Sequence, residues 1–451
     1  MVMDTFHGGV HPAGHKDLSR DVPLKVYETR GDMIFPLSQH IGAPAKAVVK
    51  KNDRVLVGQV IGEADGFVSS NIICSCSGTV KAVEKRRTIS GAMADCIVVE
   101  NDGQFETLGN YDERQDIFGL TRDDILSRIR DAGIVGMGGA GFPAHVKLAP
   151  KNYTDVNYVI VNGAECEPYL TCDDQLMRSE APAIVEGLEI ILRLFPSAKG
   201  VIAVENNKPE AVAALAGAAK GKENISVISL KTKYPQGGEK SLIKVVAGMD
   251  FPRATLPADV GCIVSNVGTV YAIERAVVFG EPLYRRAMTV TGDAAASPCN
   301  LIVRTGTLLS EVIEAAGGIR DGVTLKKALA GGPMMGTALG SLDVPTQKVS
   351  NGLTLLSRDE AEEASLAMTA CLHCGRCGTV CPSGLTPQLM AQAFEAGDLE
   401  RYEKKLYGLE CIECGSCTFI CPARRPLMQT FKRAKGEITQ KKREAAAGGN
   451  K

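Results

Sequence analysis

The chain has 451 residues, with 51 basic and 52 acidic side chains and a net charge of −1. A chain of this length is too long for a single hydrophobic core, and it lacks the basic excess of a nucleic-acid-binding platform. No stretch reaches the roughly 18 consecutive apolar residues of a membrane-spanning helix. We therefore expect a globular protein of several domains with no membrane span of its own.

The N-terminal part is expected to be a β domain. After a segment at residues 1–30, residues 31–105 contain short β-type runs such as VLVGQVI and SGTVKAV, separated by Gly, Asn and Asp. Such runs predict a small all-β domain. The pattern resembles a biotinyl or lipoyl carrier, but the stretch SSNIICSCSG at the hairpin tip has no lysine to carry a prosthetic group. We expect a docking module in which Cys74 and Cys76 are packed thiols.

Two further domains follow a polar, irregular stretch at residues 101–121, which we interpret as a linker. From 122 to 285, the strand-like runs VNYVIVN, KGVIAVE, ISVISL and GCIVSN alternate with helical stretches such as APAIVEGLEIILRLF. This alternation predicts an α/β domain with a largely parallel sheet. Residues 286–345 return to short strands around one helix, TLLSEVIEAAG, which predicts a small α+β domain.

A glycine-dense stretch, GIVGMGGAGFPAHVK, opens the α/β domain at residues 133–147. Gly136, Gly138 and Gly141 match G-x-G-x-x-G, but a helix-like segment precedes them and Phe142-Pro143 follows at once, so a dinucleotide fingerprint is disfavoured. A bare backbone of this kind can approach a planar ring or a phosphate closely, and Lys147 can balance phosphate charge. The alternative is a tight turn in a packed loop.

Eight of the 15 cysteines lie in two runs, CLHCGRCGTVCP at 371–382 and CIECGSCTFICP at 411–422. This spacing is typical of two four-iron clusters, in which the fourth ligand of each cluster comes from the other run. Zinc, which usually takes two well-separated cysteine pairs, and a redox disulfide are the alternatives. We expect one cluster on Cys371, Cys374, Cys377 and Cys421, and a second on Cys411, Cys414, Cys417 and Cys381, within a domain at 360–430.

The remaining cysteines have no disulfide-framework spacing, which favours a reducing cytosol. Residues 431–451 are rich in lysine and arginine, and we expect a solvated basic tail there. Such a tail either aids solubility only or binds a partner or lipid headgroups.

Four stretches occur in a characteristic order: GMGGAGFPAHVK, VNGAECEP, QGGEKSLI and SNVGT. They resemble motifs of the NADH-oxidising, FMN-binding subunit of complex I. With FHGGVHP near the N-terminus and a β unit before the flavin loop, the chain is more similar to the RnfC component of the Rnf ion-translocating electron transport complex, over essentially its whole length. The resemblance implies a barrel-sandwich hybrid-like β domain, a Rossmann-like FMN domain, a soluble-ligand-binding β-grasp domain, and a ferredoxin-like helical domain with two 4Fe-4S clusters.

The resemblance also implies FMN as a cofactor and NAD(H) as a substrate, with the redox cofactors, and no catalytic side chain, carrying the chemistry. Phe142 and Glu167 would face the nicotinamide nucleotide. Two departures from complex I are Ala164, where that family has an aspartate, and Leu256, where it has an aromatic residue. The implied FMN contacts are Gly136, Gly138, Lys147, Asn162, Glu165, Gly238, Glu239, Asn266 and Thr269.

The implied function is electron transfer within a membrane-bound ferredoxin:NAD oxidoreductase that translocates ions, on the cytoplasmic face of the bacterial membrane. The implied partners are the membrane components of the Rnf complex and its iron-sulfur component RnfB, with ferredoxin as an indirect partner and no nucleic acid. An alternative is the soluble flavin and iron-sulfur cobalamin reductase of propanediol-utilisation compartments. Its flavin loop lies near the chain start, whereas about 130 residues precede the loop here. A scaffold with relic clusters is disfavoured by the intact cysteine runs.

Overall fold

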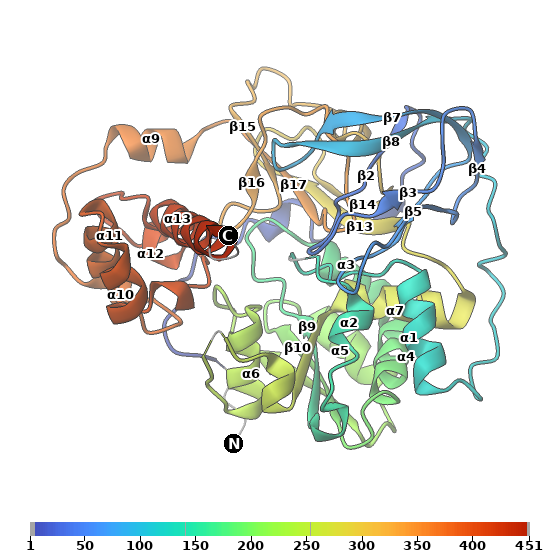
Figure 1. The fold of residues 1–451 in the computed structure, drawn as a ribbon, viewed down its shortest axis with the longest axis horizontal. Helices are drawn as coiled ribbons and strands as arrows, with labels where there is room; N and C mark the ends of the chain where they lie inside the picture. Colours follow the sequence, from blue (N-terminus) through green and yellow to red (C-terminus); the bar gives the residue numbers. More distant parts are fainter. Residues whose placement is uncertain (1–4, 140, 253, 449–451) are drawn as a thin grey trace. The chain divides into compact units, whose positions relative to one another are not determined.

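A computed structural model describes residues 5–139, 141–252 and 254–448. The chain divides into two compact units (Figure 1). The larger unit contains Gly14–Leu230 and Pro257–Arg358, and the smaller unit contains the described parts of Met1–Ala13, Lys231–Leu256 and Asp359–Lys451. Each unit is described below by itself.

The larger unit begins with a β domain of two antiparallel sheets, ordered β2-β8-β7-β4 and β3-β5-β6. Cys74 and Cys76 are fully buried in its apolar core, which confirms the prediction of packed thiols. The long strands β7 and β8 form a twisted pair in Figure 1. The strands are β2 (Met33–Pro36), β3 (Lys46–Ala47), β4 (Arg54–Val55), β5 (Val60–Glu63), β6 (Ile72–Ile73), β7 (Gly78–Arg87) and β8 (Met93–Asn101).

An α/β domain follows, and its four strands are parallel in the order β11-β10-β9-β12, as the alternating pattern predicts. Strand β10 is buried at every position after its first, because helices cover both faces of such a sheet. The strands are β9 (Tyr158–Gly163), β10 (Lys199–Glu205), β11 (Ile225–Leu230) and β12 (Cys262–Asn266). The helices are α1 (Arg122–Asp131), α2 (Ala144–Lys147), α3 (Cys172–Ser179), α4 (Ala181–Leu192), α5 (Pro209–Ala218) and α7 (Val267–Phe279).

The third domain of the larger unit is a six-stranded mixed sheet in the order β1-β14-β13-β17-β15-β16. Two of its strands, β17 (Gly352–Leu356) and β1 (Leu24–Val26), lie outside the expected range 286–345. Strand β1 runs parallel to β14 at the sheet edge. The other elements are β13 (Arg285–Thr291), β14 (Cys299–Arg304), α8 (Leu309–Ala315), β15 (Lys327–Ala330) and β16 (Thr337–Ala338).

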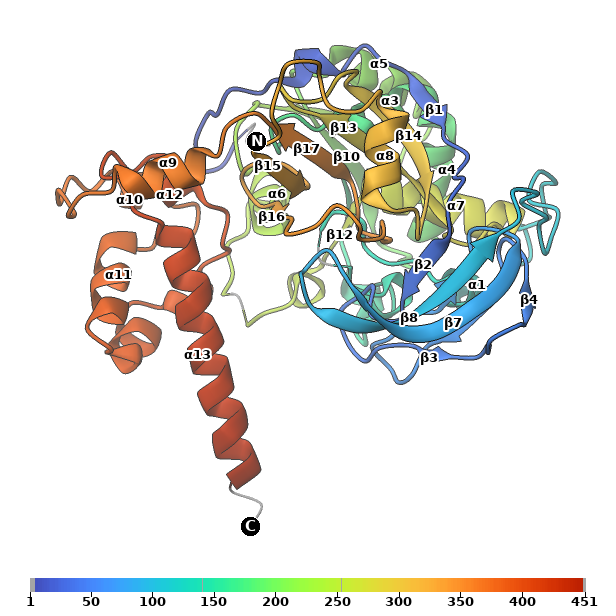
Figure 2. The same cartoon turned by 90° about the horizontal axis from the view of Figure 1, so that it is seen from above.

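The smaller unit is helical: α6 (Glu239–Ala247), α9 (Glu360–Leu366), α10 (Arg376–Thr379), α11 (Pro387–Glu395), a π-helix (Arg401–Lys405), α12 (Ser416–Phe419) and α13 (Leu427–Gly448). The expectation of a solvated tail from residue 431 is wrong for its first turns. Phe431, Ala434 and Ile438 on α13 are buried in the core of this unit, because their spacing places them on one helical face. Figure 2 shows the rest of α13 continuing beyond the other helices of the unit.

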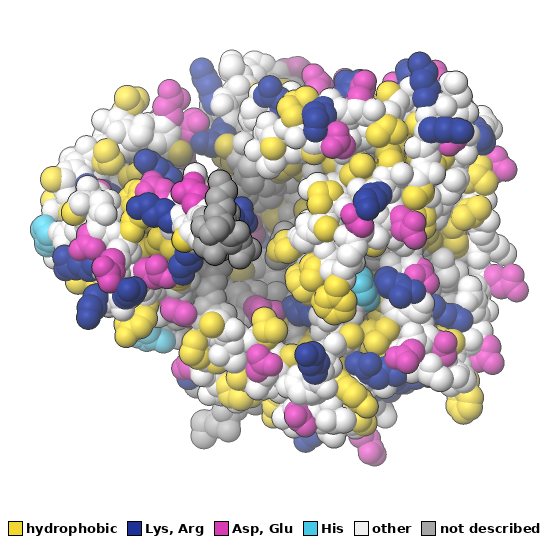
Figure 3. Space-filling view, in the orientation of Figure 1, with side chains coloured by type: hydrophobic (Ala, Val, Ile, Leu, Met, Phe, Trp, Pro, Cys, Tyr) yellow, Lys and Arg dark blue, Asp and Glu magenta, His cyan; other side chains and the backbone are white. Residues whose placement is uncertain are grey.

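Among the described residues, no helix combines the length and the apolar character needed to cross a bilayer. On the face drawn in Figure 3, basic and acidic side chains are interspersed, as expected for nearly equal numbers of each.

Candidate functional site

The glycine-dense loop lies between α1 and α2 and is closed by its own backbone. Gly133 ends α1 with φ of 66°, a left-handed conformation that favours glycine. The N–H of Gly136 donates to the carbonyl of Phe142 at 2.8 Å, and the N–H of Gly141 donates to the carbonyl of Gly136 at 3.1 Å. These bonds hold together the described residues of the loop on either side of Ala140, which lies outside the described residues. The predicted contact residue Lys147 is the last residue of α2.

This loop packs against the N-terminus of α7. The N–H of Met137 donates to Oγ1 of Thr269 at 2.9 Å, and a Cβ at Gly138 would lie 3.2 Å from the Cβ of Asn266. Asn266 is the N-cap of α7, because its Oδ1 accepts from the N–H of Gly268 at 2.9 Å. The structure thus brings Gly138, Asn266 and Thr269 together, and a side chain at position 138 would crowd Asn266.

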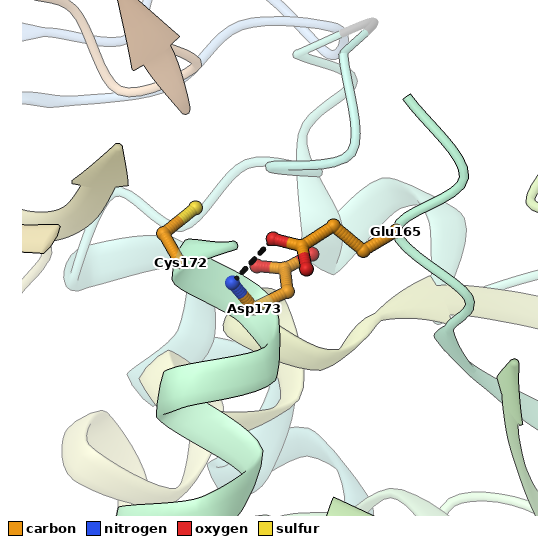
Figure 4. A group of neighbouring side chains, drawn as sticks. All are labelled: Glu165, Cys172 and Asp173. Carbon is orange, nitrogen blue, oxygen red and sulfur yellow. Dashed lines mark hydrogen bonds between the residues drawn. The ribbon is translucent and has the colours of Figure 1, made fainter. Parts of the chain in front are cut away.

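The loop after β9 carries the predicted contacts Asn162 and Glu165. Asn162 Oδ1 accepts from the N–H of Ala164 at 3.1 Å. Glu165 points to the N-terminus of α3 (Figure 4), where its carboxylate accepts from the N–H groups of Asp173 at 2.7 Å and Asp174 at 3.3 Å. Because the N-cap residue of α3 makes no side-chain cap bond, Glu165 supplies the acceptor that unpaired first-turn N–H groups require. The sequence motif did not indicate this capping role.

Glu165, Cys172 and Asp173 each place one potential metal-binding atom within 4.8 Å of the others. The Glu165 carboxylate is already bound by the helix N–H groups, and Asp173 accepts from Nδ2 of Asn266 at 2.7 Å. Burial raises the pKa of Glu165 to about 8, while the nearby Lys16 ammonium opposes that rise. The group is therefore explained by capping and positioning, without a metal.

Glu167, the predicted nucleotide contact, bonds to the domain that follows. Its Oε1 accepts from the backbone N–H of Met334 at 2.5 Å and of Met335 at 3.1 Å, in the loop between β15 and β16. Burial raises the pKa of Glu167 to about 7. Of the two departures from complex I, Ala164 is fully buried, whereas Leu256 is 63% exposed.

Gly238 and Glu239 belong to the smaller unit, where Gly238 is the N-cap of α6 and Glu239 is its first residue. Just before them, Gln236 is completely buried, and its Oε1 and Nε2 have no hydrogen-bond partner within the described part of the chain. A buried amide without a partner is unfavourable by about 1–3 kcal/mol, and in proteins such groups are commonly paired with ordered water or a ligand. This observation fits a flavin-binding role for the QGGEKSLI stretch.

The cysteines of the two runs line two separate cavities in the smaller unit. One cavity, of about 290 Å³, is lined by three cysteines of the first run and one of the second, and the other cavity has the reverse composition. Thiolates grouped in this way fit iron-sulfur clusters. The first cavity contains Cys371, Cys374, Cys377 and Cys421, and the second contains Cys411, Cys414, Cys417 and Cys381.

The two cavities differ in exposure. Cys374 in the first cavity is exposed, and the neighbouring Leu372 is 62% exposed. The second cavity is enclosed by apolar side chains that include Met390 and Phe431. Burial raises the pKa of the Cys411 thiol to about 11. A bound metal would hold that sulfur as a thiolate.

Backbone donors surround the second cavity. The N–H of Leu385 lies 3.4 Å from Sγ of Cys381, and the N–H of Glu413 lies 3.4 Å from Sγ of Cys411. Hydrogen bonds to cluster sulfurs are one of the factors that set a reduction potential. On another side, the Tyr234 hydroxyl donates to the carbonyl of Cys414 at 2.8 Å.

Three buried or largely buried lysines escaped sequence reasoning: Lys16, Lys208 and Lys348. Lys208 Nζ donates to the carbonyl of Ala164 at 2.7 Å. Lys348, only 1% exposed, donates to the carbonyls of Gly133, at 2.6 Å, and Asn71. A single lysine carries no pattern that distinguishes it from a surface residue, so no local signal could have found these contacts.

Comparison with protein families assigns four domains. The matches are an RnfC barrel sandwich hybrid domain at residues 4–104, a Nuo51 FMN-binding domain at 129–275, an SLBB domain at 288–338, and a 4Fe-4S dicluster domain at 364–422. The chain thus combines an FMN-binding domain with a two-cluster domain, and FMN and 4Fe-4S clusters are its cofactors.

Relatives match nearly the whole chain. The C component of the Na(+)-translocating ferredoxin:NAD(+) oxidoreductase complex of Acetobacterium woodii is 42% identical over 98% of both chains. The proton-translocating counterpart of Clostridium ljungdahlii is 40% identical over 90% of this chain and 88% of that protein, and the C component of the ion-translocating oxidoreductase complex of Rhodobacter capsulatus is 41% identical over 97% and 84%. These names do not favour the cobalamin reductase alternative.

The fold is also similar to a solved structure, that of an NAD+-reducing [NiFe]-hydrogenase. The TM-score is 0.51 at 19% identity, over 69% of this chain and 63% of that chain, which is a likeness of fold alone. The identity and coverage of the sequence relatives are decisive: the chain belongs to the RnfC family of the Rnf ferredoxin:NAD(+) oxidoreductase complex.

Proposed function

We propose that the chain is the electron-transfer component of a membrane-bound, ion-translocating ferredoxin:NAD oxidoreductase. The observation that carries this proposal is the pair of four-cysteine cavities in a chain that also contains an FMN-binding domain. Bound FMN would exchange two electrons with NAD(H) and single electrons with the clusters, a conversion that clusters alone do not perform. The protein's own part is to bind, orient and shield these groups.

We propose that the cysteines of each cavity ligate one 4Fe-4S cluster. The first would use Cys371, Cys374, Cys377 and Cys421, and the second Cys411, Cys414, Cys417 and Cys381. The lining of the two cavities supports this interleaved assignment. The apolar enclosure and the two N–H donors of the second cavity would give its cluster a potential different from that of the exposed first cluster.

For FMN we propose contacts from the residues of the flavin-like motifs. The glycine loop would offer backbone N–H groups, and Lys147 would neutralise phosphate charge. Gln236, which was absent from the sequence-based set, is added because its buried amide has no partner in the described structure. The remaining proposed contacts are Gly136, Gly138, Asn162, Glu165, Gly238, Glu239, Asn266 and Thr269.

For NAD(H) we propose Phe142 as a ring-stacking side chain and Glu167 as an acceptor. The hydrogen bonds of Glu167 to Met334 and Met335 use one carboxylate oxygen, Oε1, and so fix the orientation of the side chain. We interpret the α/β domain at 122–285 as Rossmann-like, the domain at 286–345 as a β-grasp fold, and the domain at 360–430 as ferredoxin-like.

We further propose that the chain is peripheral and lies on the cytoplasmic face of the membrane. The relatives are named as parts of larger complexes, which supports assembly with other Rnf proteins. We propose the iron-sulfur component RnfB as a direct partner and ferredoxin as an indirect one. The β domain at 31–105 would serve as a docking module.

Anaerobic purification, followed by flavin and iron analysis and a titration with NADH, tests this function. The expected result is one FMN and, for two four-iron clusters, about eight irons per chain. Addition of NADH should bleach the flavin and then produce a cluster signal by paramagnetic resonance. If dithionite reduces the flavin but NADH does not, the proposed reaction with NAD(H) is contradicted. The cofactor assignment would still stand.

A further inference from the structure

The segment Gly14–Arg20 lies along the loop that carries Glu165 and Glu167. The rings of His15 and Tyr169 stack at 4.6 Å with an interplanar angle of 19°, and the N–H of Tyr169 donates to the carbonyl of Gly14 at 2.7 Å. Further along, Oγ of Ser19 and Oγ1 of Thr171 are hydrogen-bonded at 2.7 Å. The N-terminal segment therefore contacts this loop over most of its length.

Lys16 makes the central contact. Its Nζ donates to three carbonyls of one loop: Glu165 at 2.9 Å, Glu167 at 3.1 Å and Leu170 at 2.5 Å. A lysine ammonium has three N–H donors, so these carbonyls satisfy it completely. The Lys16 side chain is only 14% exposed, and Nζ lies 4.0 Å from Oε2 of Glu165.

The loop has an unfavourable backbone that needs external support. Glu165 has φ of 44° and Tyr169 has φ of 72°, a left-handed region that side-chain-bearing residues rarely adopt. Conformations of this kind persist only where the surroundings determine them. The Lys16 ammonium is such a determinant, because it gathers three carbonyls that lie between and beside the two left-handed residues.

We propose that Lys16 is a positioning residue, which holds the loop so that the Glu165 and Glu167 side chains are oriented for the flavin and the nucleotide. This role rests on the proposed function of the loop. It goes beyond the flavin motifs, because Lys16 lies about 150 residues before the loop in the chain.

The charge of Lys16 also acts on Glu165. Burial raises the pKa of the Glu165 carboxyl, Lys16 and Lys208 oppose the rise, and the carboxylates of Asp173 and Asp174 add to it. Removing the ammonium should therefore raise the pKa of Glu165 further. Other titratable or charged groups near Lys16 or on the elements packed around Glu165 are Glu205, Cys166, Cys172 and Arg286.

The test compares Lys16→Met and Lys16→Arg in the full-length, cofactor-loaded chain, with the exposed Lys25→Met as a matched control. We expect Lys16→Met to keep both clusters, to exchange amide hydrogens at 165–170 at least about ten-fold faster, and to reduce its flavin with NADH about ten-fold more slowly. The acid limb of its pH–rate profile should move to higher pH, because Glu165 stays protonated at higher pH. Lys16→Arg should recover much of the protection of the 165–170 amides from exchange, and Lys25→Met should behave as the wild type.

The proposal would be overturned if amide hydrogens at 165–170 exchanged in Lys16→Met at the wild-type rate. It would also be overturned if NADH reduced the flavin more slowly but with an unchanged pH profile, because that result would indicate general damage. If Lys16→Met does not fold, the same measurements on Lys16→Gln decide. If NADH does not reduce the flavin of the wild-type protein, the proposed function is refuted. The amide-exchange measurement would still decide the role of Lys16.

Discussion

Replacing Lys348 by methionine should alter stability by an amount that depends on pH. The Lys348 amine is 1% exposed and bonds to Gly133, Asn71 and, at 3.2 Å, Ser70 Oγ, with no carboxylate among these partners. Burial lowers its pKa from 10.5 to about 7. Between these values the unfolded chain binds more protons than the folded one, so the stability of the wild type rises with pH over this window.

The size of the effect follows from the linkage relation. From pH 7 to pH 9 the free energy of unfolding of the wild type should rise by at most about 3 kcal/mol relative to that of Lys348→Met, because methionine does not titrate. Well below pH 7 the difference in free energy of unfolding between wild type and Lys348→Met should be constant, because both the folded and the unfolded lysine are then charged. In that range the variant loses hydrogen bonds to two carbonyls, which costs about 1–3 kcal/mol each, but it no longer buries a charge. These effects oppose each other, so the free energy of unfolding of the variant should be close to that of the wild type.

The assay is urea denaturation of wild type, Lys348→Met and the exposed control Lys51→Met at about pH 6.5, 7.5 and 9, which bracket the titration window, followed by circular dichroism. Subtracting variant from wild type cancels the titration of the groups that Lys348 does not influence; the exception is His40, whose pKa is lowered by burial and by the Lys348 charge. The reasoning would be refuted if the difference in free energy of unfolding between wild type and Lys348→Met stayed the same across this pH range. It would also be refuted by an equal pH dependence in Lys51→Met.

Three other substitutions test the proposed sites. Cys421→Ala should abolish the paramagnetic signal of the cluster built on the Cys371 run and spare the other, although it lies beside the second run; selective loss of the other signal would contradict the interleaved ligands. Lys147→Ala should weaken FMN binding roughly ten-fold, measured by flavin release on dilution, because a charge-assisted contact to phosphate is lost; wild-type retention would place the phosphate elsewhere. Glu167→Gln should keep FMN and lower NADH-dependent flavin reduction in stopped flow, as one acceptor of about 1–3 kcal/mol is weakened; a wild-type rate and affinity would move the nucleotide site away from this residue.

Local patterns predicted the elements whose causes are local. The four strands of the parallel sheet are short runs rich in Val and Ile, and the structure confirms each of them. The glycine loop and the cysteine runs were equally visible, because their chemistry depends on spacing along the chain. The burial of Phe431, Ala434 and Ile438 could have been inferred from their helical spacing, but the many surrounding lysines and arginines favoured a solvated tail.

Contacts between distant segments were beyond prediction. Glu165 could be matched to a flavin motif, but its capping of α3 depends on how the chain folds back after β9. The same holds for Lys16 and Lys348, whose acceptors are backbone carbonyls that any sequence provides. The pairing of strand β1 with the third domain was unpredictable for a similar reason. Its three residues, LKV, form too short a run to indicate a partner strand.

The pairing of β1 with β14 has a consequence for synthesis on the ribosome. Leu24 pairs with Asn300, so the edge of this sheet is incomplete until well over half of the chain has been translated. At about 5–20 residues per second, the N-terminal strand waits roughly 15 to 55 seconds for its partner. Its shortness and its exposed Lys25 limit wrong pairing during that wait. The nascent N-terminal segment would therefore join the third domain only after the β domain that follows it in the chain has had time to fold.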